Sequence, residues 1–202
     1  MAFPQYPHGY LYGNVSWTVP IGTQLRELNV VHDIVHRSIF INKTPLFGKI
    51  DMEHGRTMPF ILAGKMCTMT LARDGNVFTY TLKIEDDSFE AYKEKYQKEF
   101  EMWKMNIDGT DWVVVLDKNA MEAFGNGEKL TTESVFEGNG TVISFNLGQT
   151  LCRIESEGAS KIHLNCNFYK NNELVLSLLS LDDPGEKRHN AERIIKSRFL
   201  EV

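Results

Sequence analysis

Cysteine is scarce in this chain of 202 residues, which contains only Cys67, Cys152 and Cys166. An odd number without a close pair argues against a disulfide-stapled scaffold and is typical of the reducing cytosol. Cys67 and Cys152 lie in apolar segments, so we predict that both are buried free thiols. Cys166 has no Lys or Arg beside it in sequence to favour a thiolate. A buried or half-buried thiol is therefore the preferred interpretation, with a redox role as the alternative.

Basic clusters and long apolar runs are also missing. The chain has 22 Lys and Arg residues against 27 Asp and Glu residues, a net charge of −5. Because binding to phosphates needs clustered cations, we expect no nucleic-acid partner. No apolar stretch is long enough to span a bilayer, and residues 1–14 lack the basic and apolar regions of a signal peptide. The sequence therefore predicts a cytoplasmic protein without membrane insertion.

The motifs of common enzyme classes are absent as well. The chain has no P-loop, no Gly-x-Gly-x-x-Gly that opens a helix and no Gly-x-Ser-x-Gly. Acid pairs such as Asp182-Asp183 lie at predicted element ends, where solvated charge is the ordinary interpretation. A glycosidase-like carboxylate pair that meets only in space stays open. We predict a protein that is not an enzyme, with no catalytic, metal-binding or cofactor-binding residues.

An internal repeat is the most informative feature that is present. Anchors of the first half recur in the second with an offset of 84 to 86 residues: Phe60, Leu62 and Cys67 match Phe145, Leu147 and Cys152, Asn42 matches Asn126, and Trp17 matches Trp103. Several anchors that share one offset to within a residue are hard to obtain by chance. They predict two copies of one domain.

Within each copy the pattern is mostly β. Short aliphatic or alternating runs are separated by tight-turn dipeptides such as Asp74-Gly75 and Asn139-Gly140. The predicted strands are 28–31, 38–41, 66–72, 78–84, 112–116, 141–147, 152–155 and 161–169. Many short strands with such turns predict an all-β protein of two tandem β-sandwich domains, which are joined by a short helix and followed by a C-terminal helix.

Two segments have helical periodicity. Between the copies, aromatic residues recur at helical spacing after a capping box that begins at Asp87: Phe89, Tyr92, Tyr96, Phe100 and Trp103. We interpret this stripe as packing against a sandwich rather than as a ligand site. At the end of the chain, residues 186–199 place Ala191, Ile194, Ile195 and Phe199 on one helix face. That helix is expected to pack on its own domain, with partner docking as the alternative.

These patterns divide the chain into five parts. We predict a leader at 1–14, a first β-sandwich domain at 15–86 and a linker helix at 87–102. The second β-sandwich domain spans 103–181, and a helical tail spans 182–202.

One segment imitates a metal site. His32-Asp-Ile-Val-His36 is similar to the zinc-peptidase motif, whose two histidines lie one helical turn apart. That chemistry needs a helix, so that both imidazoles reach one metal ion, and a Glu where this chain has Asp33. Predicted strands flank the segment, which places it in a hairpin connection, and the second copy has no histidine there. A metal-dependent hydrolase is therefore the last of three functional hypotheses.

The order of motifs along the chain resembles the Fas apoptotic inhibitory molecule family. In the second copy the resemblance is carried by Trp103, the Asp108-Gly109 turn, the run 113–130 with its Asn126-Gly127 hairpin, and Phe145-Asn-Leu-Gly148 before Cys152. In the first copy, 15–19 and 78–84 look like the family's opening and its Tyr-rich strand. The chain departs from the pattern at Phe124-Gly125, where relatives carry Trp-Cys, in 34–60 and after Leu181.

The resemblance implies two β-sandwich domains in an intracellular, non-enzymatic protein that restrains death-receptor-triggered apoptosis. It also implies roles in neurite outgrowth and in protection against protein aggregation. The expected partners are apoptotic signalling proteins or misfolded clients, which exposed strand edges could bind by strand addition. The alternative is a β-sandwich that binds a carbohydrate or a small ligand. Because the closer resemblance covers 103–178, we expect the second domain to be the active one.

Overall fold

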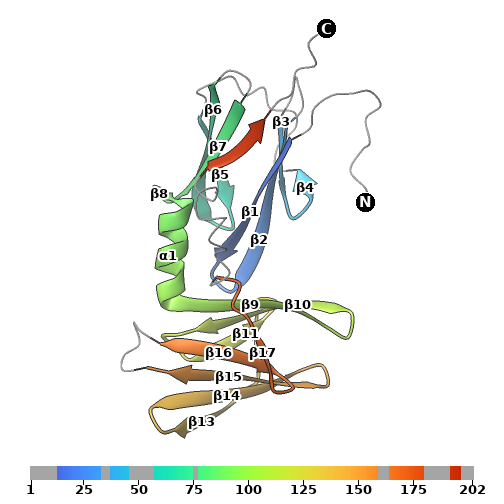
Figure 1. Cartoon of the computed structure of the whole chain (residues 1–202), viewed down its shortest axis with the longest axis vertical. Coiled ribbons are helices and arrows are strands. Elements are labelled where there is room, and N and C mark those ends of the chain that lie inside the picture. The colour runs from blue at the N-terminus through green and yellow to red at the C-terminus, as the bar shows by residue number, and fades with distance from the viewer. Residues whose placement is uncertain are drawn as a thin grey trace. The chain divides into compact units, whose positions relative to one another are not determined.

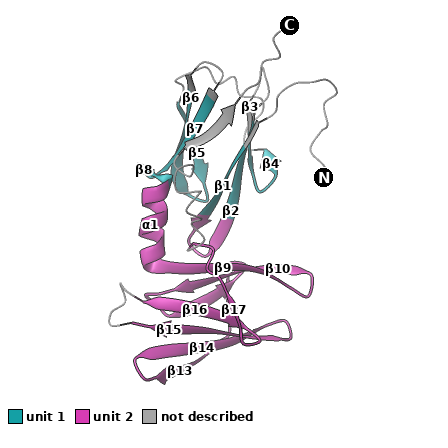
Figure 2. Ribbon diagram, in the orientation of Figure 1, with its two compact units in different colours: residues 1–19, 26–89, 188–202 teal, residues 20–25, 90–187 magenta. Residues whose placement is uncertain are grey.

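The structure is a computed structural model that describes residues 13–32, 37–45, 57–74, 77–158, 164–179 and 192–196. The chain divides into two compact units, which are described separately (Figure 2). Unit 1 comprises residues 1–19, 26–89 and 188–202, and unit 2 comprises 20–25 and 90–187. The domain boundaries expected from the sequence stay a prediction, and the expected leader falls outside the described residues up to residue 12.

Two antiparallel sheets contain the strands of the first copy (Figure 1). One has the order β1 (Gly13–Ile21), β2 (Gln24–His32), β3 (Arg37–Ile41) and β4 (Thr44–Pro45). The other has the order β18 (Glu192–Lys196), β7 (Val77–Ile84), β6 (Lys65–Asp74) and β5 (Thr57–Leu62), with β8 (Asp87–Ser88) paired to β7. Trp17, Leu28, Met69 and Tyr80 are buried here, each at most 1% exposed.

Unit 2 repeats this plan. One sheet has the order β12 (Glu128–Lys129), β11 (Glu122–Gly125), β10 (Thr110–Asp117) and β9 (Phe100–Ile107). The other runs from β13 (Glu133–Glu137) through β14 (Gly140–Leu147), β15 (Thr150–Glu157) and β16 (Asn165–Lys170) to β17 (Glu173–Val175). Side chains from both sheets form one core, in which the rings of Trp103 and Phe168 lie 5.4 Å apart. The expected all-β fold of tandem sandwiches is confirmed.

Strand β10 is buried on both faces. Val114 and Leu116 belong to the sandwich core, whereas Val115 packs with Tyr96 and Met102 on the opposite side of the sheet. Because successive side chains of a strand point to opposite faces, a strand covered on both sides reads as a continuous aliphatic run. This explains why residues 113–116 are all apolar, whereas a strand exposed on one face would alternate apolar and polar residues.

Helix α1 (Phe89–Glu99) supplies that second cover. Tyr92 and Tyr96 are buried, and their hydroxyls donate hydrogen bonds of 2.8 and 2.7 Å to the carbonyls of Pro20 and Gly22. The expected packing role of the aromatic stripe is thus confirmed for the helix. The helix is nevertheless shorter than predicted, because Phe100–Ile107 pairs along its whole length with β10 and forms β9 instead.

The internal repeat is confirmed down to single hydrogen bonds. The side-chain oxygen of Asn42 accepts a hydrogen bond from the backbone N–H of Glu27, and the backbone N–H of Asn42 donates to the Glu27 carbonyl, both at 2.8 Å. Asn126 makes the same two bonds with Val113, again at 2.8 Å. Both asparagines also have positive φ, of 47° and 51°, a conformation that Asn tolerates better than most residues.

Most predicted strands are confirmed. Seven of them lie inside β2, β3, β6, β7, β10, β14 and β15, and residues 165–169 of the eighth lie in β16. Several strands were not predicted from the sequence, namely β5, β9, β11, β13 and β17. In the parts of the chain that the structure describes, no helix is long and apolar enough to cross a bilayer.

The prediction of a C-terminal helix over 186–199 is wrong for residues 192–196, which form a strand. Glu192–Lys196 forms β18 and pairs antiparallel with β7, while the rest of the predicted helix lies outside the described residues. Ile194 and Ile195 are β-branched and suit a strand. An edge strand also offers backbone hydrogen bonds that a local helical pattern does not reveal, so tertiary pairing overrides the helical periodicity.

Candidate functional site

Strand β13 is an exposed edge of the five-stranded sheet. Among the described residues it pairs with β14 alone, and all five of its residues are exposed. Val135 is 55% exposed and Phe136 is 86% exposed. Natural proteins usually shorten, cover or charge such edges because their free backbone groups can pair with another chain. We call Glu133–Glu137 the β13 edge.

The pairing register explains which side chains share a face. Ser134 and Phe136 stand opposite Ile143 and Thr141, so they lie on the face of β14 that carries Ile143 into the core. Glu133, Val135 and Glu137 lie on the other face. Phe136 therefore has the orientation of a core residue but almost none of its burial, and an acidic residue flanks the apolar pair on each side.

An open hollow of about 390 Å³ lies beside Phe136. Its other lining residues come from the β13–β14 turn, from β14 and β15, and from the chain after β10 and before β16: Lys118, Met121, Gly138, Asn139, Gly140, Thr141, Ser156, Gly158 and Leu164. Most of them are small or polar. The hollow can therefore accept one side chain or a small ligand with hydrogen-bonding groups.

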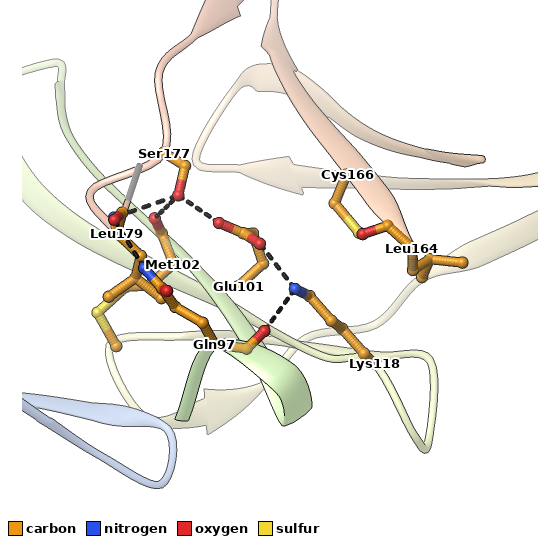
Figure 3. Close-up of polar contacts among 8 residues, drawn as sticks. All are labelled: Gln97, Glu101, Met102, Lys118, Leu164, Cys166, Ser177 and Leu179. Atoms are coloured by element: carbon orange, nitrogen blue, oxygen red, sulfur yellow. Dashed lines mark hydrogen bonds and ion pairs between the residues drawn. The ribbon is translucent and has the colours of Figure 1, made fainter. Parts of the chain in front are cut away.

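Lys118 contributes no free cation to this hollow (Figure 3). Its ammonium lies 2.8 Å from Glu101 Oε2 and donates to the Gln97 carbonyl at 2.8 Å. Glu101 also accepts from the Ser177 hydroxyl, which in turn accepts from the Leu179 amide at 3.2 Å. The side chains of Lys118 and Glu101 are only 8% and 15% exposed. This buried network fixes the segment after β17 against β9, and the exposed charge near Phe136 remains acidic.

The three cysteines are free thiols, as expected from the sequence. Cys67 and Cys152 are buried at matching positions, and each donates to the carbonyl two residues earlier at 3.7 Å. Burial raises the pKa of Cys67 and of Cys166 to about 11, and also raises the pKa of Cys152. Lys118 lowers the pKa of Cys166 less than burial raises it. None of the three has the low pKa of a reactive thiol.

We expect all three thiols to resist alkylation in the folded protein. Because the thiolate is the nucleophile, a pKa of about 11 for Cys166 lowers its reactive fraction at pH 8 about a hundredfold relative to an unfolded cysteine. The measurement is the rate of iodoacetamide labelling, read by mass spectrometry with and without urea. Labelling of folded Cys166 at the unfolded rate would contradict this interpretation.

The segment 32–36, on which the hydrolase hypothesis depends, lies mostly outside the described residues. His32 ends β2 and pairs with Arg37 across the hairpin, while His36 lies outside the described residues. Within the described ranges, no group of three or more His, Cys, Asp or Glu side chains could hold a metal ion. The candidate site that sequence reasoning missed is the β13 edge.

Gly125 packs closely against its neighbours, so a side chain at this position would require Leu130 and Trp112 to shift. A Cβ atom would lie 2.9 Å from Leu130 Cδ2 and 3.1 Å from the Trp112 ring.

The chain matches a known protein family. A family model described as Fas apoptotic inhibitory molecule matches residues 14–177, which spans strands of both units. The chain belongs to this family. Fas apoptotic inhibitory molecule 1 of Homo sapiens and that of Mus musculus are each 34% identical to it over 90 residues, covering 45% of this chain and 50% of the relative. The Bos taurus protein is 33% identical over 45% of each chain. The matched region thus spans about half the length of these relatives.

Proposed function

We propose that this protein restrains apoptosis by binding other proteins and catalyses no reaction. Membership of the Fas apoptotic inhibitory molecule family supports the apoptotic role, because the similar human and mouse proteins carry that name. The β13 edge supports the binding role, since it combines an unpaired strand edge with an 86% exposed Phe136. We place the protein in the cytoplasm, where death-receptor signalling complexes assemble their caspases.

The β13 edge recognises an extended segment by strand addition. Main-chain hydrogen bonds along the free side of β13 supply affinity without sequence preference, and alternate side chains supply specificity. On one face, Phe136 and the hollow beside it accept an apolar side chain. On the other face, Glu133 and Glu137 flank Val135 and favour two basic side chains that stand four residues apart in the partner. The partner segment is therefore extended, apolar on one side and basic on the other.

A second copy of β13 does not fit this description. Pairing two such strands would place glutamates near glutamates, and like charges opposite each other on neighbouring strands are destabilising. The flanking acids thus protect the edge from self-association while they attract a basic partner. Segments of misfolded proteins also expose extended backbone, so suppression of aggregation would use the same edge.

The proposed role is tested by caspase activity in cells that express the full chain at graded levels. One arm receives a death-receptor stimulus and the other a mitochondrial stimulus. We expect caspase activity to fall with increasing expression in the death-receptor arm, and to change less in the mitochondrial arm. Equal caspase activity with and without the protein in both arms would overturn the proposal.

The hollow supports a second candidate function, the binding of a small ligand. Its volume of about 390 Å³ falls in the range of ligand sites, and Phe136 could stack on a sugar ring. A rise in melting temperature across a panel of glycans and metabolites would support this function, because a ligand that binds only the folded state stabilises it. That rise should be lost in Phe136→Ala.

A further inference from the structure

The outer edge of β7 is covered by a strand from the distant end of the chain. Figure 1 shows the red arrow of β18 beside β7. In their antiparallel register, Glu192 stands opposite Thr81 and Lys196 stands opposite Val77. The short strand β8 pairs with Lys83 and Ile84 farther along β7. We call residues 77–81 the β7 edge. The strand that pairs with this edge, β18, follows it in the sequence by more than a hundred residues.

We propose that the β7 edge is a second strand-binding site, which β18 blocks until an extended segment of a partner protein displaces it. Within the described ranges β18 is paired on one side only, because it is the last strand in the order β18-β7-β6-β5. It is five residues long, against ten for β6. An edge strand of this length contributes few backbone hydrogen bonds, so it opens more readily than the strands inside the sheet.

The register shows what kind of segment the site takes. Ile194 and Ile195 stand opposite Thr79 and Phe78, with charged residues at both ends of the strand. A partner segment that replaces β18 would therefore carry two adjacent β-branched aliphatic residues between charged ones, in antiparallel orientation to β7. Its acidic residue would stand opposite Thr81 and its basic residue opposite Val77.

Being joined to the same chain gives β18 an advantage over a partner. A tethered segment acts at an effective concentration that reaches the millimolar range, so a free peptide of equal intrinsic affinity competes poorly. The block is removed when β18 can no longer pair. This inference concerns unit 1 and is independent of the β13 edge, so either can fail without the other.

The test uses the full chain and a fluorescent peptide of residues 190–198. Successive amides of a strand point to opposite sides, so replacing Ile194 and Ile195 together by proline removes at least one backbone N–H that faces β7 and should release the β7 edge. We expect the peptide to bind this variant at least tenfold more tightly than it binds the wild-type chain. A peptide that itself carries both Ile194→Pro and Ile195→Pro is the matched control and should bind neither protein. Equal binding of the unmodified peptide to both proteins, or to neither, would overturn the proposal.

Hydrogen exchange of the wild-type protein provides a second test that needs no variant. The amides of β18 should exchange at least tenfold faster than those of β6, because β18 leaves the sheet in a local opening. Adding the peptide in millimolar excess should accelerate exchange of β18 further. If the amides of β18 and β6 were equally protected from exchange, β18 would not open separately from the sheet, and the inference would be contradicted. Formation of a dimer in the variant with both prolines, without peptide binding, would also contradict it.

Discussion

Replacing Lys118 by methionine is expected to lower the free energy of unfolding by about 3–5 kcal/mol. The substitution keeps the aliphatic stem but removes the ammonium that pairs with Glu101 at 2.8 Å and donates to the Gln97 carbonyl. Glu101, only 15% exposed, would then keep a buried charge without its counterion. An uncompensated buried charge is among the most destabilising changes that a single substitution can cause. Urea unfolding followed by tryptophan fluorescence measures the effect.

The same substitution at an exposed lysine is the matched control. Lys129 pairs with Glu122 at 2.6 Å, but the two side chains are 61% and 39% exposed. Lys129→Met should therefore cost less than about 1 kcal/mol. The double variant Lys118→Met with Glu101→Leu should recover most of the lost stability, because it removes both charges. If Lys118→Met and Lys129→Met had equal effects, the buried pair would not fix the segment after β17.

Phe136→Asp is expected to weaken binding of extended basic segments about thirtyfold or more without lowering the melting temperature. Removing a central aromatic anchor costs about 2 kcal/mol or more in an interface, which corresponds to that factor. Since Phe136 is 86% exposed in the free protein, its loss should change stability by no more than about 0.5 kcal/mol. The measurement is binding to an array of peptides in which apolar and basic residues alternate, together with thermal unfolding.

Two further variants separate the apolar and the charged parts of the β13 edge. Leu151→Asp is the matched control, since Leu151 is 58% exposed but lies on β15 near the opposite end of β14. It should leave peptide binding unchanged. Replacing both Glu133 and Glu137 by lysine should weaken binding at low salt and have less effect at high salt, because salt screens exposed charges. A loss of binding in Leu151→Asp equal to that in Phe136→Asp would contradict a site at β13.

The repeat and its buried anchors could be predicted from the sequence because they depend on local patterns. Apolar residues that recur at one offset must face equivalent cores, and Cys67 and Cys152 are buried in matching hairpins. Asn42 and Asn126 recur because a positive φ and two backbone hydrogen bonds limit the residues that fit there. These requirements act within a few residues and so leave a trace in the sequence.

Elements whose conformation depends on pairing with another strand could not be predicted in the same way. The helical spacing of aromatic residues continues past Glu99, yet Phe100–Ile107 forms β9 because it pairs along its whole length with β10. The tail has helical periodicity too, but Glu192–Lys196 pairs with β7. Local propensity is a weak constraint when a strand edge offers a full ladder of backbone bonds.

The candidate site was missed for a related reason. Glu133-Ser-Val-Phe-Glu137 precedes a turn and a strong strand, so a strand there could have been inferred from Asn139-Gly140 and the run after it. Its exposure, however, follows from its place at the end of the order β13-β14-β15-β16-β17. Sequence periodicity shows which face of a strand is apolar but does not show which strand of a sheet lies at the edge.

Caspase activity after a death-receptor stimulus, in cells that express the wild-type chain, Phe136→Asp or Leu151→Asp at matched levels, tests the central claim most directly. We predict that the wild type and Leu151→Asp lower caspase activity equally and that Phe136→Asp does not lower it. Thermal unfolding of the purified variants confirms that all three proteins are folded. If Phe136→Asp protects as well as the wild type, the β13 edge does not carry the function of this protein.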